Sequence, residues 1–228
     1  MEKMKRGTRI VSIKNTPMVI FEGPETISDD IVKYNNFWEF ELFNKWSKHF
    51  PTEGLMLDIG ANIGSQCVQF KVAFPNLKIW AFEPFPENFD LLKQNTQQFE
   101  DVHVFNVGVG SSNSMVHFGG DAPNNSGVIR VVEKSNNTNL VLSLDTIKFP
   151  EPVKMIKIDI EHHELSAFEG MKQLLIKDKP LIWLEDHGQP IGKGKATEYL
   201  RTLGYDMIEK ELSTKDFLMK HITQTYFG

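Results

Sequence analysis

The sequence predicts an α/β fold built around an open, mostly parallel sheet. Short apolar runs without helical periodicity alternate with amphipathic segments, which is typical of buried parallel strands joined by crossover helices. The run Leu55–Ile59 leads into a turn bracketed by Gly60 and Gly64, and a helix follows. In open α/β sheets a ligand lies beyond the carboxyl ends of the strands, so this turn marks the expected site.

Length and composition favour one soluble domain with modest additions. The chain has 228 residues, of which 40% are hydrophobic and 24% charged, and its net charge of −5 provides no field that favours nucleic acid. No apolar run approaches the ~20 residues needed to cross a bilayer, and no secretion signal follows the start. The single cysteine, Cys67, excludes an internal disulfide framework. We therefore expect a cytoplasmic protein without a membrane partner.

Residues 1–50 predict a hairpin and one long helix packed on the core, ahead of a main domain at 51–228. Two strand-like segments flank a turn at 15–17, and Ser28 is the expected N-cap of the helix. Apolar residues then recur at helical spacing to about His49. We interpret this helix as buried on two sides. The alternative is that some of its aromatic side chains cover a bound substrate.

The main domain alternates strands and helices. We expect helices at 65–74, 87–99, 164–176 and 195–203, and strands at 54–59, 77–82, 102–108, 153–161, 180–185, 205–209 and 216–221. Residues 111–139 interrupt the alternation, and their Gly, Ser and Asn content predicts a β insertion before the strand at 153–161. In this loop Asn124, Asn125 and Ser126 are either contacts to a polar substrate or solvated turn residues.

Polar side chains end most of the apolar runs. The carboxyl ends of parallel strands open on one edge of a sheet, so we expect these side chains to cluster there. Burying them unpaired would be costly, which makes a polar ligand their natural partner. The residues are Asp58, Glu83, Asn106, Asp159, Glu161, Glu185 and His187.

The glycine turn and the next acid together indicate a nucleoside ligand. Glu83 lies close to the roughly 20 residues from the turn at which an acid grips ribose hydroxyls. The helix that opens at Gly64 would aim free N–H groups and a positive dipole end at the same ligand.

Three motifs in order resemble those of FkbM-type S-adenosylmethionine-dependent methyltransferases: Asp58–Gly64, Ala81–Pro84 and Ile156–Glu161. The resemblance runs from about Phe50 to the C-terminus. It implies a Rossmann-like class I methyltransferase sheet of seven strands with the last antiparallel, and usually O-methylation of a hydroxyl. It also implies S-adenosyl-L-methionine as cofactor, with the backbone at 106–108 beside the adenine. The cofactor-binding residues would be Asp58, Gly60, Ala61, Asn62, Gly64, Glu83, Pro84, Asn106, Val107, Gly108 and Asp159.

Methyl transfer to oxygen sets the requirements for the catalytic residues. The acceptor oxygen must be held about 3 Å from the methyl carbon, and a poorly acidic hydroxyl needs a base. We predict that Asp159 and Glu161 position the acceptor, and that His187 or Glu161 takes the proton. Glu164 is a further candidate, although an acid in the first turn of a helix also stabilises that helix through its dipole.

The segment Glu161–Glu164 departs from the resembled pattern, in which a glycine usually follows the first acid. His162 places a ring there, so either the backbone differs or the acceptor pocket is reshaped. Two histidines and several carboxylates raise the alternative of a divalent metal. Adjacent histidines on a helix point about 100° apart, however, and we expect no metal.

The sequence therefore predicts an S-adenosylmethionine-dependent O-methyltransferase that acts on a hydroxyl of a small molecule or glycan. An NAD-dependent oxidoreductase is an alternative, but the turn lacks the G-x-G-x-x-G pattern. A nucleic-acid methyltransferase is disfavoured because no basic stripe with interleaved aromatics is present. A module that binds the nucleoside without transfer also fits. The acceptor and the oligomeric state stay open.

Overall fold

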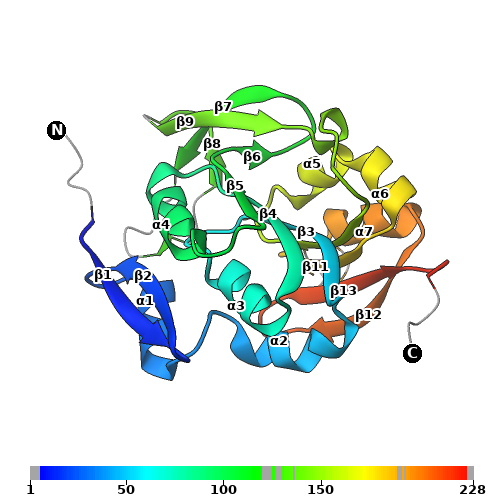
Figure 1. Cartoon of the computed structure of the whole chain (residues 1–228). Coiled ribbons are helices and arrows are strands. Elements are labelled where there is room, and N and C mark those ends of the chain that lie inside the picture. The colour runs from blue at the N-terminus through cyan, green and yellow to red at the C-terminus, as the bar shows by residue number, and fades with distance from the viewer. Residues whose placement is uncertain are drawn as a thin grey trace.

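The computed structural model describes residues 6–119, 125–126, 130–135, 137–188, 192 and 194–224. A central sheet dominates this part of the chain (Figure 1). Its strands are β3 (Glu53–Ile59), β4 (Asn76–Phe82), β5 (Val102–Phe105), β10 (Val153–Ile158), β11 (Leu181–Glu185), β12 (Tyr205–Glu211) and β13 (Asp216–His221). They form a seven-stranded sheet in the order β12-β13-β11-β10-β3-β4-β5.

The central sheet is mixed, which corrects the expectation of a mostly parallel sheet. Strands β11, β10, β3, β4 and β5 pair in parallel. Strand β13 is antiparallel to both β11 and β12. The parallel block therefore supplies the edge at which the carboxyl ends of strands converge, and the antiparallel pair extends the sheet beyond β11.

Helices cover both faces of the sheet. They are α2 (Phe40–Trp46), α3 (Ser65–Ala73), α4 (Pro86–Thr96), α5 (Glu164–Glu169), α6 (Lys172–Asp178) and α7 (Lys195–Thr202). Within β3, Leu55 and Leu57 pack with α5, α6 and α7, whereas Met56 packs with α2, α3 and α4. Successive side chains of a strand point to opposite faces, so both faces of β3 are buried, as its continuous apolar run predicts.

The N-terminal segment holds a hairpin and two helices. The hairpin, β1 (Thr8–Ile13) paired with β2 (Thr16–Phe21), is confirmed. The single long helix is wrong: α1 (Thr26–Tyr34) ends before α2 begins, and a 3-10 turn, η1 (Ser47–His49), follows α2. The chain turns between the helices because Asn35 and Glu39 take positive φ angles of 47° and 56°.

The first helix begins earlier than the sequence suggested. Glu25 is its N-cap and accepts a 2.7 Å hydrogen bond from the backbone N–H of Ser28, so Ser28 lies inside the helix and does not cap it.

Asn95 of α4 ties the hairpin to the glycine turn. Its side chain accepts from the backbone N–H of Val19 at 2.6 Å and donates to the carbonyls of Val19 and Ile63 at 2.9 and 2.7 Å. The hairpin, α1 and the start of α3 also share an apolar cluster. The division of the chain at residue 50 stays a prediction.

The insertion forms a second sheet in the described part of the chain. Its strands are β6 (Gly108–Val109), β7 (Ser114–Gly119), β8 (Arg130–Val132) and β9 (Asn137–Leu142), in the order β6-β9-β7-β8, and a 3-10 turn, η3 (Leu144–Thr146), follows. The predicted strand at 102–108 therefore ends at Phe105, and the chain enters the second sheet at Gly108. This sheet lies along the edge of the fold above β5 in Figure 1.

Candidate active site

A cavity of about 470 Å³ lies at the carboxyl ends of β3, β4, β10 and β11. Residues of the second sheet and of the segment before α2 complete its wall. Most of the strand-end residues that we expected to cluster line this cavity together: Asp58, Glu83, Asp159, Glu161, Glu185 and His187.

The glycine turn packs directly against the chain that leaves β10. Gly60 has a φ of 84°, and a Cβ at this position would lie 1.9 Å from the carbonyl oxygen of Asp159. The N–H groups of Gly60 and Ala61 both donate to the carbonyl of Phe82, at 2.9 and 3.1 Å. Gly60, Ala61 and Asn62 line the cavity, whereas Gly64 sets the start of α3 with a φ of 84°. The turn therefore brings the ends of β3, β4 and β10 together.

Glu83 at the end of β4 is bound to the glycine turn. Its two carboxylate oxygens accept from the backbone N–H groups of Asn62 and Phe85, each at 2.9 Å. Burial raises the pKa of Glu83 to about 7, although these hydrogen bonds oppose the shift. The Asn88 side chain also hydrogen-bonds to this carboxylate, so about one of its four lone-pair sites stays open to a ligand. Glu83 and Pro84 line the cavity.

The segment after β5 contributes backbone to the cavity. The side-chain amide of Asn106 donates to the carbonyls of Glu83 and Pro84, at 2.8 and 3.2 Å, and its oxygen accepts from Asn139 at 3.0 Å. Asn106 therefore holds the loop that follows Glu83. Of the residues predicted beside the adenine, Gly108 lines the cavity.

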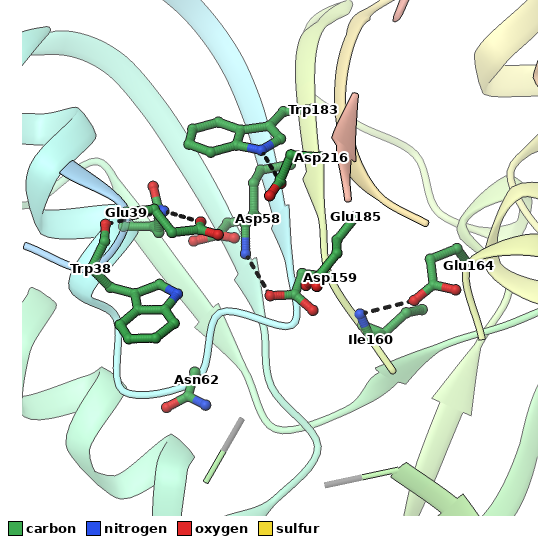
Figure 2. Close-up of polar contacts among 12 residues, drawn as sticks. Trp38, Glu39, Asp58, Asn62, Asp159, Ile160, Glu164, Trp183, Glu185 and Asp216 are labelled. Atoms are coloured by element: carbon green, nitrogen blue, oxygen red, sulfur yellow. Dashed lines mark hydrogen bonds and ion pairs between the residues drawn. The ribbon is translucent and has the colours of Figure 1, made fainter. Parts of the chain in front are cut away.

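Glu39 and Asp58 bring acceptor oxygens to one end of the cavity (Figure 2), and Gln66, which also lines the cavity, contacts Glu39. Gln66 donates to the Glu39 carboxylate at 2.7 Å, and Cys67 donates its thiol hydrogen to Asp58 at 3.0 Å. The other oxygens, Oδ1 of Asp58 and Oε1 of Gln66, are buried and have no hydrogen-bond partner among the described residues. Buried acceptors without donors are costly, so this end is suited to a ligand rich in N–H groups.

A buried lysine lies among the carboxylates. Lys157 Nζ is 3.3 Å from Asp159 Oδ2. Burial lowers the pKa of Lys157, but the negative charges of Asp159, Glu39 and nearby Asp58 outweigh it and raise that pKa above its ordinary value. Burial raises the pKa of Glu39, and its acidic neighbours add to the shift. The acids outnumber this lysine, which favours a cationic ligand.

Asp159, Glu185 and His187 form a chain of polar contacts. The side chains of Glu185 and Asp159 lie next to each other (Figure 2). Burial, the Asp159 charge and a hydrogen bond with Asp159 together raise the pKa of Glu185 far above its ordinary value. Nε2 of His187 lies 3.2 Å from Oε1 of Glu185. Nδ1 of His187 is buried and has no hydrogen-bond partner in the residues described. Burial, helped by the charges of Lys215 and His162, lowers the pKa of His187.

The two other acids after β10 have different surroundings. Glu161 lines the cavity and has a φ of 51°. The Glu164 carboxylate accepts from the backbone N–H groups of Ile160 and His162, at 3.3 and 3.1 Å. Glu164 is buried, and burial raises its pKa to about 7. Glu164 therefore holds the loop before α5.

The insertion reaches the glycine turn through Ser126. The Ser126 hydroxyl donates to Glu25 at 2.9 Å and lies 3.2 Å from Asn62 Oδ1. Ser126 is thereby engaged within the protein, and both Asn125 and Ser126 line the cavity. The prediction for Asn124 lies outside the described residues.

Within those residues no group of three or more His, Cys, Asp or Glu side chains is arranged to hold a metal ion. None of the helices described is long and apolar enough to cross a bilayer.

Sequence reasoning missed Glu39, Gln66 and Lys157. Lys157 had a signal, because a lysine within an apolar strand run must find buried partners. Glu39 was missed because the predicted long helix placed it within a helix, whereas it lies in the turn between α1 and α2. Gln66 carries no signal of its own at the start of α3.

The fold and the site define a methyltransferase-like α/β protein. The fold is similar to that of the FkbM methyltransferase from Methylobacillus flagellatus, with a TM-score of 0.57, 19% identity and coverage of 75% of this chain and 44% of that one. It is also similar to that of M. jannaschii TYW2 in complex with AdoMet, with a TM-score of 0.53, 12% identity and coverage of 96% of this chain and 89% of that one.

The chain belongs to the methyltransferase FkbM domain family, whose model matches residues 58–210. It is 27% identical over 128 residues to the hexuronic acid methyltransferase AglP of Haloferax volcanii. The match covers 54% of this chain and 52% of that protein, so the chain spans about half the length of this curated relative.

Proposed function

We propose that this protein is an S-adenosylmethionine-dependent O-methyltransferase that acts on a hydroxyl of a sugar or another small molecule. The observation that carries the proposal is the single cavity that joins the glycine turn, Glu83 and the Asp159–Glu185–His187 chain. Membership of the FkbM family supports methyl transfer. The hexuronic acid methyltransferase relative supports a sugar acceptor.

The residues that line the two ends of the cavity fit the two ends of S-adenosylmethionine, its ribose and its α-ammonium group. The Glu83 carboxylate accepts from Asn62, Phe85 and Asn88, and its remaining lone pair suits a ribose hydroxyl. At the other end, the unpartnered oxygens of Asp58 and Gln66, with the Glu39 carboxylate, suit the three N–H donors of an α-ammonium group. S-adenosylmethionine, when bound, supplies the electrophilic methyl carbon.

His187 is the proposed base. With its hydrogen on Nε2 donated to Glu185, the ring keeps a lone pair on Nδ1. As the acceptor oxygen bonds to the methyl carbon and the carbon–sulfur bond breaks, the hydroxyl proton passes to Nδ1 of His187. The lowered pKa of His187 keeps the ring neutral at pH 7 and ready to accept this proton.

Asp159 and Glu161 are the proposed acceptor-positioning residues. Both line the cavity next to Glu185 and His187. Asp159 is itself held by Lys157 and Glu185, so its carboxylate has little freedom to move. A fixed carboxylate can hold the acceptor oxygen in line with the methyl carbon, which an in-line displacement requires.

Turnover assays test this function. Purified protein is incubated with S-adenosylmethionine and a panel of hexuronic acids, hexoses and their glycosides, and S-adenosylhomocysteine release and a mass gain on the acceptor are measured. We expect at least one acceptor to be methylated, and His187→Ala and Glu161→Gln each to lower kcat at least tenfold.

Two results would contradict the account. Near-normal kcat in both variants with saturating acceptor would remove the assignment of the base. Tight binding of S-adenosylhomocysteine without transfer to any acceptor would indicate a nucleoside-binding module and not an enzyme.

A further inference from the structure

The loop between β10 and α5 contains two consecutive residues in the left-handed region. Glu161 has a φ of 51° and His162 a φ of 75°. Neither is glycine, and a side chain with a Cβ pays a conformational cost at such angles. The Glu164 carboxylate fixes this backbone by accepting from the N–H of His162. A glycine at position 162 would take the same conformation without that cost.

The ring of His162 lies against the ring of His187. The two ring centroids are 4.9 Å apart, with an interplanar angle of 53°. His162 is otherwise exposed, so the contact joins a surface side chain of the β10–α5 loop to a half-buried ring beyond the end of β11. The backbone cost at position 162 therefore coincides with a contact to the proposed base.

We propose that His162 is a positioning residue that holds the His187 ring with Nε2 on Glu185 and Nδ1 free to accept the substrate proton. The inference rests on the proposed function, since it concerns the base of that reaction. Strained conformations persist where the surrounding structure enforces them, and they concentrate at functional sites. Here the strained backbone at position 162 places the His162 imidazole against the His187 ring, where it limits rotation of that ring.

The charges around His187 define the second effect of His162. Lys215 and His162 lower the pKa of His187 after burial, whereas Asp159 and Asp186 raise it, and Glu185 is bound directly at Nε2. Loss of the His162 ring would expose His187 to water and remove one of the groups that lower its pKa. The pKa of His187 should then rise.

Three variants test the proposal. His162→Gly and His162→Asn remove the ring with residues that tolerate positive φ, and His162→Phe restores a ring without charge. We expect the Gly and Asn variants to keep Tm at or above the wild-type value and to bind S-adenosylhomocysteine normally. Their kcat should fall at least fivefold with little change in acceptor KM, and the acidic limb of their kcat–pH profile should move to higher pH. The Phe variant should recover most of kcat.

The imidazole titration of His187, followed by NMR without substrates, gives a readout that does not depend on turnover. We expect the midpoint for His187 to rise in His162→Gly relative to wild type. Wild-type kcat and an unchanged His187 midpoint in the Gly variant would overturn the positioning role. Absence of turnover in the wild-type protein would instead overturn the proposed function, while the NMR comparison still decides whether His162 controls the His187 ring.

Discussion

Glu83 shows how one buried carboxylate links two elements. Its oxygens hold the backbone of the glycine turn and of the residue that precedes α4, and its side chain is 5% exposed. Burial raises its pKa to about 7, so the charge that we propose binds the ribose is lost near neutral pH.

We predict that Glu83→Gln weakens S-adenosylhomocysteine binding about tenfold, because an amide offers one acceptor oxygen and no charge. In the wild-type protein affinity should fall as the pH drops through about 7, since protonation competes with the ligand. The variant should lose this part of the pH dependence. Calorimetry between pH 6 and 8.5 measures both effects, with the exposed Glu100→Gln as control. Equal affinities at every pH would refute the role of Glu83.

Glu164 gives a prediction for stability. The pKa of Glu164 is about 7 in the folded protein, against its ordinary value of 4.5 in an unfolded chain, so the folded state binds more protons between these pH values. Its contribution to stability is therefore greatest below pH 4.5 and is lost as the pH rises through 7.

Glu164→Gln should consequently stabilise the protein at pH 8 by about 1–3 kcal/mol and change little at pH 5. Urea unfolding of both proteins at the two pH values measures the difference. A variant that is less stable at pH 8 would show that the carboxylate charge supports the loop more than burial opposes it.

The sequence predicted the residues at strand ends better than those that support them. Asp58, Glu83 and Asp159 could be placed because an acid ends an apolar run at each position. Glu39 and Gln66 reach the cavity through a left-handed turn and a helix start, and neither follows a local pattern. Glu185 was expected at the same edge, but its hydrogen bond to Asp159 depends on how two neighbouring strands end.

At the scale of elements, the glycine turn needs glycine at position 60 for two reasons, the positive φ angle and the close approach of neighbouring backbone. Gly60 has a positive φ and packs on the carbonyl of Asp159. Gly23 has the same φ of 84°, and a Cβ there would meet nothing within 4 Å. A substitution at Gly23 therefore measures the free-energy cost of the positive φ angle alone, whereas one at Gly60 adds the cost of the clash with Asp159.

We expect Gly23→Ala to cost about 1 kcal/mol, the penalty of a left-handed alanine. Gly60→Ala should cost clearly more and abolish cofactor binding, because the turn must move away from β10 to accommodate the methyl group. Chemical unfolding and calorimetry with S-adenosylhomocysteine compare the two variants. Similar stability losses and intact binding in both would mean that the turn has more room than its contacts indicate.

The helix predictions failed where periodicity continued across a break. Apolar spacing runs from α1 into α2, but Asn35 caps the first helix in the left-handed conformation. The predicted helix at 164–176 is two helices, α5 and α6, separated at Gly170. A Cβ on Gly170 would lie 1.9 Å from the carbonyl oxygen of Gly110, so the second sheet approaches the backbone there. Tertiary contacts of this kind are invisible to a local pattern.

At the scale of the whole molecule, the order of the strands explains why three motifs distant in sequence form one site. Strand β3 lies between β4 and β10, so the ends that carry Asp58, Glu83 and Asp159 are neighbours. The alternation of apolar runs and helices predicted these central strands. The predicted β insertion is confirmed by β7, β8 and β9, but the pairing of β9 with β6 in a separate four-stranded sheet depends on contacts between distant segments, which a local pattern does not predict.

The most direct test of the central claim is a crystal structure of the protein with S-adenosylhomocysteine. We predict the ribose hydroxyls on Glu83, the α-ammonium between Glu39, Asp58 and Gln66, and the sulfur directed toward Asp159 and His187. A nucleoside bound outside the cavity, or one whose ribose lies away from Glu83, would contradict the account.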